Sequence, residues 1–156
     1  MTRYLALSAL CALIAGPAAA QAAHSGAWHS VEAKSSWSDG KFPKGFSLEI
    51  DVTFSDNKVV YHSANDTDKA KVGGLDFTAS LDGKVSPVEN QTRFNQIAVR
   101  QLGPDQLEIL EMKDGDVVVG SIWTFAKDGK SFFRWGVGKG PDGKSKAFNE
   151  YFQRMK

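Results

Sequence analysis

Aromatic side chains in the second half of the chain have the types and spacing of a binding site for a small apolar molecule. Four of them alternate with other residues on either side of Asp128–Gly129: Trp123, Phe125, Phe133 and Trp135. Side chains two apart on a strand share a face, so we expect these rings to line one surface. Three further rings are expected to join them: Tyr61, Phe77 and Phe152. Such a set either lines a cavity for an apolar or aromatic ligand or fills a core, and the sequence leaves both open.

Two arginines lie among the apolar strand residues of this region. Arg100 and Arg134 each neighbour an apolar residue, Val99 and Trp135 respectively. Strict alternation predicts that both arginines point outward into solvent. As an alternative, Arg134 would meet an acidic group of a ligand at the mouth of a barrel.

Other chemistry has little support in the residue types. No two of the histidines, His24, His29 and His62, have a spacing that places both on one face with a carboxylate or thiolate ligand. His24 is expected in a frayed terminus. The chain contains no G-x-S-x-G motif and no phosphate-binding loop, and its only cysteine is Cys11. We therefore predict no metal site, no cofactor and no enzymatic activity.

The elements that position the aromatic residues are strands. Apolar and polar residues alternate strictly over 46–54, which predicts a half-buried strand. After residue 80, strand-like segments are separated by the turn dipeptides Asp82–Gly83, Asp114–Gly115, Asp128–Gly129 and Asp142–Gly143. Consecutive hairpins without a long crossover favour an up-and-down meander, and closure removes its exposed edges. We predict an all-β protein with a single antiparallel up-and-down barrel of about eight to ten strands.

The first residues have the composition of a targeting segment. Arg3 precedes an almost wholly apolar run over 4–15, which is too short to span a membrane, and small residues follow up to Ala23. We predict a signal peptide over 1–22, cleaved after Ala22 with cleavage after Ala20 as the alternative, and a barrel domain over 23–156. The formal net charge of +1 argues against a nucleic-acid partner. The protein is expected to be secreted or periplasmic, without stable membrane insertion.

The two ends of the barrel domain resemble a known family. Gly26–Ala27–Trp28 and Arg154 are similar to the lipocalin (calycin) pattern, and the order of Lys34–Ser35, Leu81–Asp82–Gly83–Lys84 and the later Lys-Asp-Gly turns resembles small secreted bacterial lipocalin-like proteins. The resemblance implies that Gly-x-Trp opens the first strand and that Arg154 lies over the Trp28 ring at the closed end. The chain departs from the classical pattern, because it has no cysteine pair for the barrel and no Thr-Asp-Tyr-type segment.

The sequence leaves two functions open. The first is an exported protein that binds a small apolar or aromatic molecule in the barrel; the sequence indicates no particular protein partner. The alternative is an envelope or extracellular protein-interaction module with a filled barrel, using the loops Ser35–Gly45 and Val137–Lys146. Exposed rings at Trp37 and Phe42 would favour the alternative, and their burial would count against it.

Overall fold

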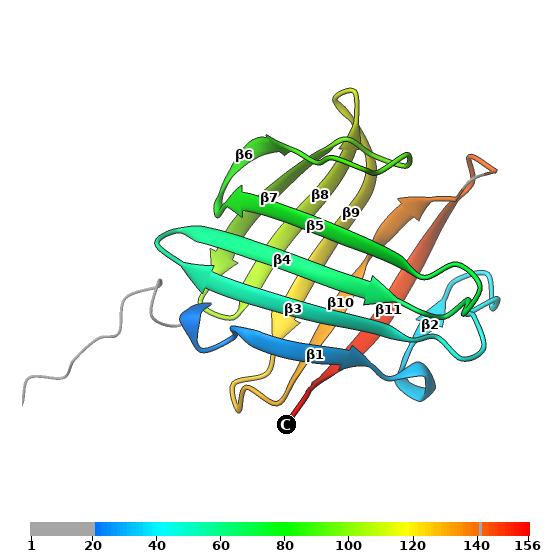
Figure 1. Cartoon of the computed structure of the whole chain (residues 1–156), viewed down its shortest axis with the longest axis horizontal. Helices are drawn as coiled ribbons and strands as arrows, with labels where there is room; N and C mark the ends of the chain where they lie inside the picture. The colour runs from blue at the N-terminus through cyan, green and yellow to red at the C-terminus, as the bar shows by residue number, and fades with distance from the viewer. Residues whose placement is uncertain (1–20, 141) are drawn as a thin grey trace, which may run out of the picture.

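The computed structural model describes residues 21–140 and 142–156, and this part of the chain forms one antiparallel sheet that curls into a nearly closed barrel (Figure 1). Its strands are β1 (Gly26–Ser30), β2 (Ser36–Trp37), β3 (Leu48–Ser55), β4 (Lys58–Asn65), β5 (Gly73–Ser80), β6 (Asp82–Pro87), β7 (Gln96–Gly103), β8 (Gln106–Lys113), β9 (Asp116–Phe125), β10 (Ser131–Lys139) and β11 (Ser145–Arg154). A single 3-10 turn, η1, covers Glu32–Lys34. The all-β barrel predicted from the sequence is confirmed.

The barrel closes where the first strand meets the last. The strand order is β5-β4-β3-β1-β11-β10-β9-β8-β7-β6, and the short β2 pairs separately with β11. These ten consecutive strands agree with the predicted number, to which β2 adds an eleventh. The two ends of the sheet, β5 and β6, follow each other in the chain through Leu81, whose carbonyl accepts a hydrogen bond from the Gln101 amide at 2.9 Å. The remaining gap in the wall therefore lies at this corner, in the middle of the sequence.

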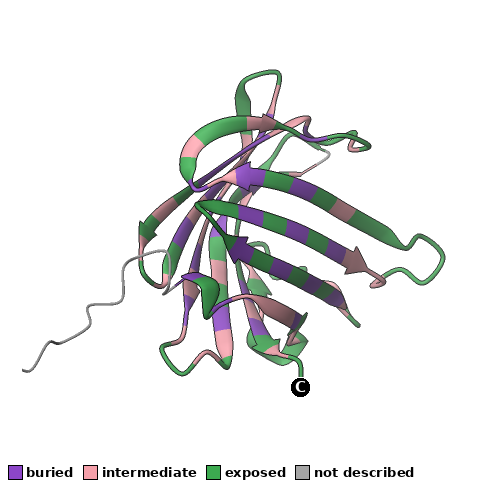
Figure 2. Cartoon of the chain, turned by 60° about the vertical axis from the view of Figure 1, so that its left-hand side comes forward, coloured by how far each residue is buried: buried purple, intermediate pink, exposed green. Residues whose placement is uncertain are grey.

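Strand alternation places one face of each strand in the core. In β3, Leu48, Ile50, Val52 and Phe54 are buried and the residues between them are exposed, and the same banding is visible on neighbouring strands in Figure 2. The tight turn between β8 and β9 has positive φ at both Asp114 and Gly115 (50° and 88°), as a two-residue primed turn requires. The alternation of apolar and polar residues along the strands and the turn residues between them thus give the hairpins that the sequence predicted.

Packed aromatic rings fill one end of the barrel, which we call the floor. Trp28 is fully buried, and Phe132 meets its ring edge-on at 5.2 Å and stacks on Phe152 at 4.5 Å. The Arg154 guanidinium lies 4.2 Å from the centre of the Trp28 ring, as the Gly-x-Trp resemblance implies. An ideal Cβ on Gly26 would lie 2.5 Å from that guanidinium, and φ there is 140°, so both space and backbone favour glycine.

The segment 21–25 seals the floor from below. The His24 ring stacks on Phe125 at 4.3 Å, and its Nε2 lies 3.0 Å from an Asp105 carboxylate oxygen. The Gln21 amide donates to the carbonyls of Gly103 and Pro104, each at 3.2 Å. The expectation that His24 belongs to a frayed terminus is wrong, because this side chain is only 4% exposed.

Burial of Gln21 bears on the two predicted cleavage positions. Residues 1–20 of the predicted signal peptide lie outside the described residues, but Gln21 is 1% exposed. Cleavage after Ala20 keeps the Gln21 hydrogen bonds, whereas cleavage after Ala22 removes them. On the prediction that a signal peptide is removed, we expect cleavage after Ala20, so that the chain begins at Gln21, and intact-mass spectrometry of protein recovered outside the cytoplasm of expressing cells tests this expectation. A mass corresponding to a chain that starts at Ala23 would contradict this expectation.

No helix among the residues that the structure describes is long and apolar enough to cross a membrane.

Candidate functional site

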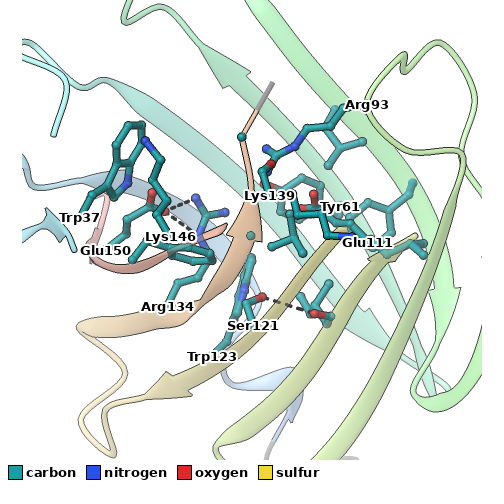
Figure 3. A pocket seen from close by; sticks show the side chains of 18 residues that line it. Trp37, Tyr61, Arg93, Glu111, Ser121, Trp123, Arg134, Lys139, Lys146 and Glu150 are labelled. Atoms are coloured by element: carbon teal, nitrogen blue, oxygen red, sulfur yellow. Dashed lines mark hydrogen bonds and ion pairs between the residues drawn. The ribbon is translucent and has the colours of Figure 1, made fainter. Parts of the chain in front are cut away.

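A cavity of about 350 Å³ occupies the end of the barrel opposite the floor (Figure 3). The cavity walls come from seven strands, β4, β5, β7, β8, β9, β10 and β11, together with Trp37 of β2. Most of the wall is apolar: Leu75, Phe77, Ile97, Ile109, Val119 and Trp123. The barrel interior is therefore divided, with a filled floor below and an open chamber above.

Three of the seven predicted aromatic residues line this chamber. Tyr61 stacks on Phe77 with ring centres 4.7 Å apart, and Trp123 meets Tyr61 at 6.0 Å. Two others, Phe125 and Phe152, are buried in the floor and do not reach the cavity. The two alternatives left open by the sequence, a filled core and a pocket, both apply, each to one half of the barrel.

The remaining two aromatic residues lie on the outer face. Phe133 and Trp135 are 38% and 50% exposed, so the expectation that they share a face with Trp123 is wrong. The register pairs Phe125 with Phe132 and Trp123 with Arg134. Directly paired residues share a face, so odd numbers in β9 correspond to even numbers in β10. Two odd-numbered residues, one on each strand of this hairpin, therefore lie on opposite faces of the sheet.

The same register turns Arg134 into the barrel, which overturns the expectation that it points outward. Arg134 pairs directly with Glu150 of β11, and its Nε donates to a Glu150 carboxylate oxygen at 2.7 Å while Nη2 donates to the same oxygen. The side chains are 19% and 7% exposed. Burial lowers the pKa of Arg134, but the surrounding groups, Glu150 foremost with Tyr61 and Glu111, together raise it above its usual value, so the guanidinium stays charged. Its charge also lies 5.2 Å from the centre of the Phe152 ring, just above the floor.

Glu111 is an inward-facing residue that the sequence analysis missed. It continues the inward series of Leu107 and Ile109 along β8, so extending the strand period by one step would have found it. Burial raises the pKa of Glu111 above its usual value, while the charges of Arg93 and Arg134 oppose that rise. Among the described residues, Glu111 has no hydrogen-bond or ion-pair partner.

The mouth of the cavity carries a ladder of aromatic rings. Strand β2 pairs with β11 and thereby holds Trp37 at the rim, where Trp37 meets Phe42 at 5.5 Å and Phe42 meets Phe46 at 4.9 Å. Lys146 lies 4.2 Å from the Trp37 ring and binds Asp39 at 2.9 Å. Trp37 and Phe42 are therefore half-buried against each other, neither freely exposed nor enclosed beneath the barrel.

Three further features of the described residues bear on the predictions: the metal-ligating side chains, an outer groove and Arg100. In the ranges 21–140 and 142–156, no three His, Cys, Asp or Glu side chains gather as a metal would require. Outside the barrel, Trp135 and Val137 border a shallow groove of about 400 Å³ over β8, β9 and β10. Arg100 lies on the outer face as predicted, 58% exposed and 3.9 Å from Glu108.

Comparison with known proteins gives structural likenesses alone. No protein-family model and no curated protein matches the chain. Among solved structures, a complex of bovine odorant binding protein with a selenium-containing odorant matches with a TM-score of 0.47 and 10% sequence identity, over 86% of this chain and 75% of that chain.

Proposed function

We propose that this protein binds one small, largely apolar molecule inside the barrel, as an exported carrier or binding protein without enzymatic activity. The observation that carries the proposal is the cavity of about 350 Å³ above the filled floor. This volume lies within the ~300–1,000 Å³ range of sites that enclose small ligands. Export is supported by the sequence features of residues 1–22, and a binding role by the absence of recognisable catalytic motifs from the sequence.

The chemistry of the walls supports a ligand with an apolar body and few polar groups. Aliphatic and aromatic side chains form most of the surface. The polar groups of the lining are Tyr61, Ser121 and the charged residues Arg93, Glu111, Arg134, Lys139, Lys146 and Glu150. A site of this kind gains affinity from burial of apolar ligand surface and takes its selectivity from a few polar contacts. The alternative function, an interaction module with a filled barrel, has less support, because only the floor is filled and the upper barrel holds the cavity.

Filling the cavity tests the proposal. Ser121 is buried on the inward face of β9, so Ser121→Phe places a ring in the chamber. We expect N-phenyl-1-naphthylamine to bind the wild-type protein in a 1:1 complex, followed by dye fluorescence, and to bind this variant at least about tenfold more weakly, equivalent to ~1.4 kcal/mol.

A neighbouring position provides the matched control. Ile122 is the next residue along β9 and borders the outer groove, so Ile122→Phe adds a ring of the same kind outside the barrel. Its affinity for the dye should equal that of the wild-type protein. Equal affinity of the Ser121→Phe variant and the wild-type protein, or no saturable binding of dye or 1-octanol by the wild-type protein, would refute the proposal.

A further inference from the structure

We propose that the natural ligand carries a hydrogen-bond donor, best supplied by a protonated amine, that binds the Glu111 carboxylate inside the cavity. The inference rests on the proposed binding function and adds the chemical class of the ligand. It follows from the apolar residues on either side of Glu111 in the cavity wall and from the partners that the other charged residues of the lining already have.

Glu111 lies in an apolar part of the wall. Its cross-strand partners are Ile97 on β7 and Val119 on β9, and both line the cavity beside it. Neither neighbour has a side-chain donor for the carboxylate. Figure 3 shows Glu111 on the side of the cavity where Tyr61 lies, apart from the Arg134–Glu150 pair. The carboxylate therefore faces the chamber without a hydrogen-bond donor from the described residues.

The other carboxylate and three of the four cations of the cavity lining already have partners. Arg134 is bound to Glu150 through two donors on one carboxylate oxygen. At the rim, the ammonium groups bind carboxylates at 3.2 Å and 2.9 Å: Lys139 with Asp116 and Lys146 with Asp39. These three pairs balance their own charges, so they leave the Glu111 charge unmatched at contact distance.

Arg93 is the remaining cation of the lining, and its position differs from that of Glu111. It is exposed, and its Nη2 donates to the Lys139 backbone carbonyl at 3.2 Å. Its charge acts on Glu111 through space, without a hydrogen bond between them. A carboxylate ligand would approach Arg93 only by bringing its charge towards Glu111 and Glu150. An amine ligand instead supplies a donor and an opposite charge to the one carboxylate of the lining without a partner, and a hydrogen bond between charged groups is stronger than one between neutral groups.

The pairing predicts a pH dependence of binding. Burial raises the pKa of Glu111, and a bound cation favours its ionised form. Affinity for an amine should therefore be highest when Glu111 is ionised in the free protein, and should fall as the pH drops below that pKa until it reaches the affinity of the Glu111→Gln variant. The charged and titratable groups that share the cavity with Glu111 are Tyr61, Arg93, Arg134, Lys139, Lys146 and Glu150.

Three ligands with the same eight-carbon chain test the inference: octylamine, 1-octanol and octanoate. Binding is measured by tryptophan fluorescence in the full folded protein, since none of the three absorbs where indole does. We expect octylamine to bind about tenfold or more tighter than 1-octanol, as a charged hydrogen bond allows, and octanoate to bind most weakly. Glu111→Gln should reduce octylamine affinity to that of 1-octanol and leave 1-octanol affinity within about twofold.

Glu108→Gln is the matched control, because Glu108 lies three residues earlier on β8 and borders the outer groove. It should keep the wild-type preference. The inference is overturned if octanoate or 1-octanol binds the wild-type protein as tightly as octylamine, if Glu111→Gln keeps the amine preference, or if octylamine affinity does not fall at acidic pH. Failure of all three ligands to bind would refute the proposed function itself.

Discussion

Replacing Arg154 with alanine is expected to lower the free energy of unfolding by about 3 kcal/mol or more. Arg154 donates three hydrogen bonds to backbone carbonyls, to Gly129 at 2.6 Å, Ser25 at 2.7 Å and Ala23 at 2.9 Å. Hydrogen bonds from a charged donor contribute roughly 1.5–3 kcal/mol each, less than additively within one group. Contact with the Trp28 ring adds ~0.5–2 kcal/mol. Urea denaturation measures the loss directly.

The effect is large because Arg154 joins three segments of the chain at the floor. The carbonyls belong to the N-terminal segment and to the β9–β10 turn, while Arg154 itself ends β11. Removal of the Arg154 side chain leaves these carbonyl acceptors without a donor and exposes one face of the Trp28 ring. For a chain of this size, a loss of about 3 kcal/mol corresponds to a decrease in Tm of about 6–12 °C.

Two variants separate this explanation from a general loss of positive charge. Arg154→Lys retains the charge but cannot supply the planar set of donors, so most of the stability loss should remain. Arg100→Ala removes an exposed arginine whose contact with Glu108 is long, and should change stability by less than ~0.5 kcal/mol. Equal stability of Arg154→Ala and Arg100→Ala would show that the floor does not depend on this side chain.

Local patterning predicted the barrel because its signals act within a few residues. Alternation in β3 fixes which side chains face the core, and the Asp114–Gly115 turn fixes the direction of the chain. The contact between Trp28 and Arg154 spans the whole domain, and it was predicted only through the resemblance to the lipocalin pattern. Its physical basis is the pairing of β1 with β11, which no local pattern specifies.

The binding site was harder to predict, since it depends on register between strands. The register of the β9–β10 hairpin determines whether Arg134 or Trp135 faces inward. Counting odd and even residue numbers without knowing the cross-strand pairs places Trp135 inside, whereas the register places Arg134 there. Register also places Arg134 opposite Glu150, so two charged residues that look solvated in the sequence form the buried pair. The division between filled floor and open chamber depends on ring packing in three dimensions, which composition does not encode.

Replacing Glu150 with methionine is expected to destabilise the protein by about 3–5 kcal/mol, because it leaves the Arg134 charge buried without its partner. The single carboxylate oxygen that receives both Arg134 donors is removed, and the apolar floor offers no replacement acceptor. The double variant Arg134→Met with Glu150→Met removes both charges and should recover most of the loss, since apolar replacements of a buried pair are often neutral. Urea denaturation of the two single variants and the double variant gives the coupling energy.

An exposed ion pair supplies the control for this cycle. Asp116→Asn breaks the contact between Asp116 and Lys139, whose side chains are 73% and 48% exposed respectively. This substitution should lower the free energy of unfolding by less than ~0.5 kcal/mol.

The same set of variants also tests ligand binding, because the Arg134 charge acts on Glu111. Without Glu150, the Arg134 charge is no longer neutralised and opposes a bound cation in the cavity, so the single variant should lose octylamine affinity along with stability. The double variant should recover both, whereas recovery of stability without recovery of amine binding would mean that Glu150, and not Glu111, receives the ligand.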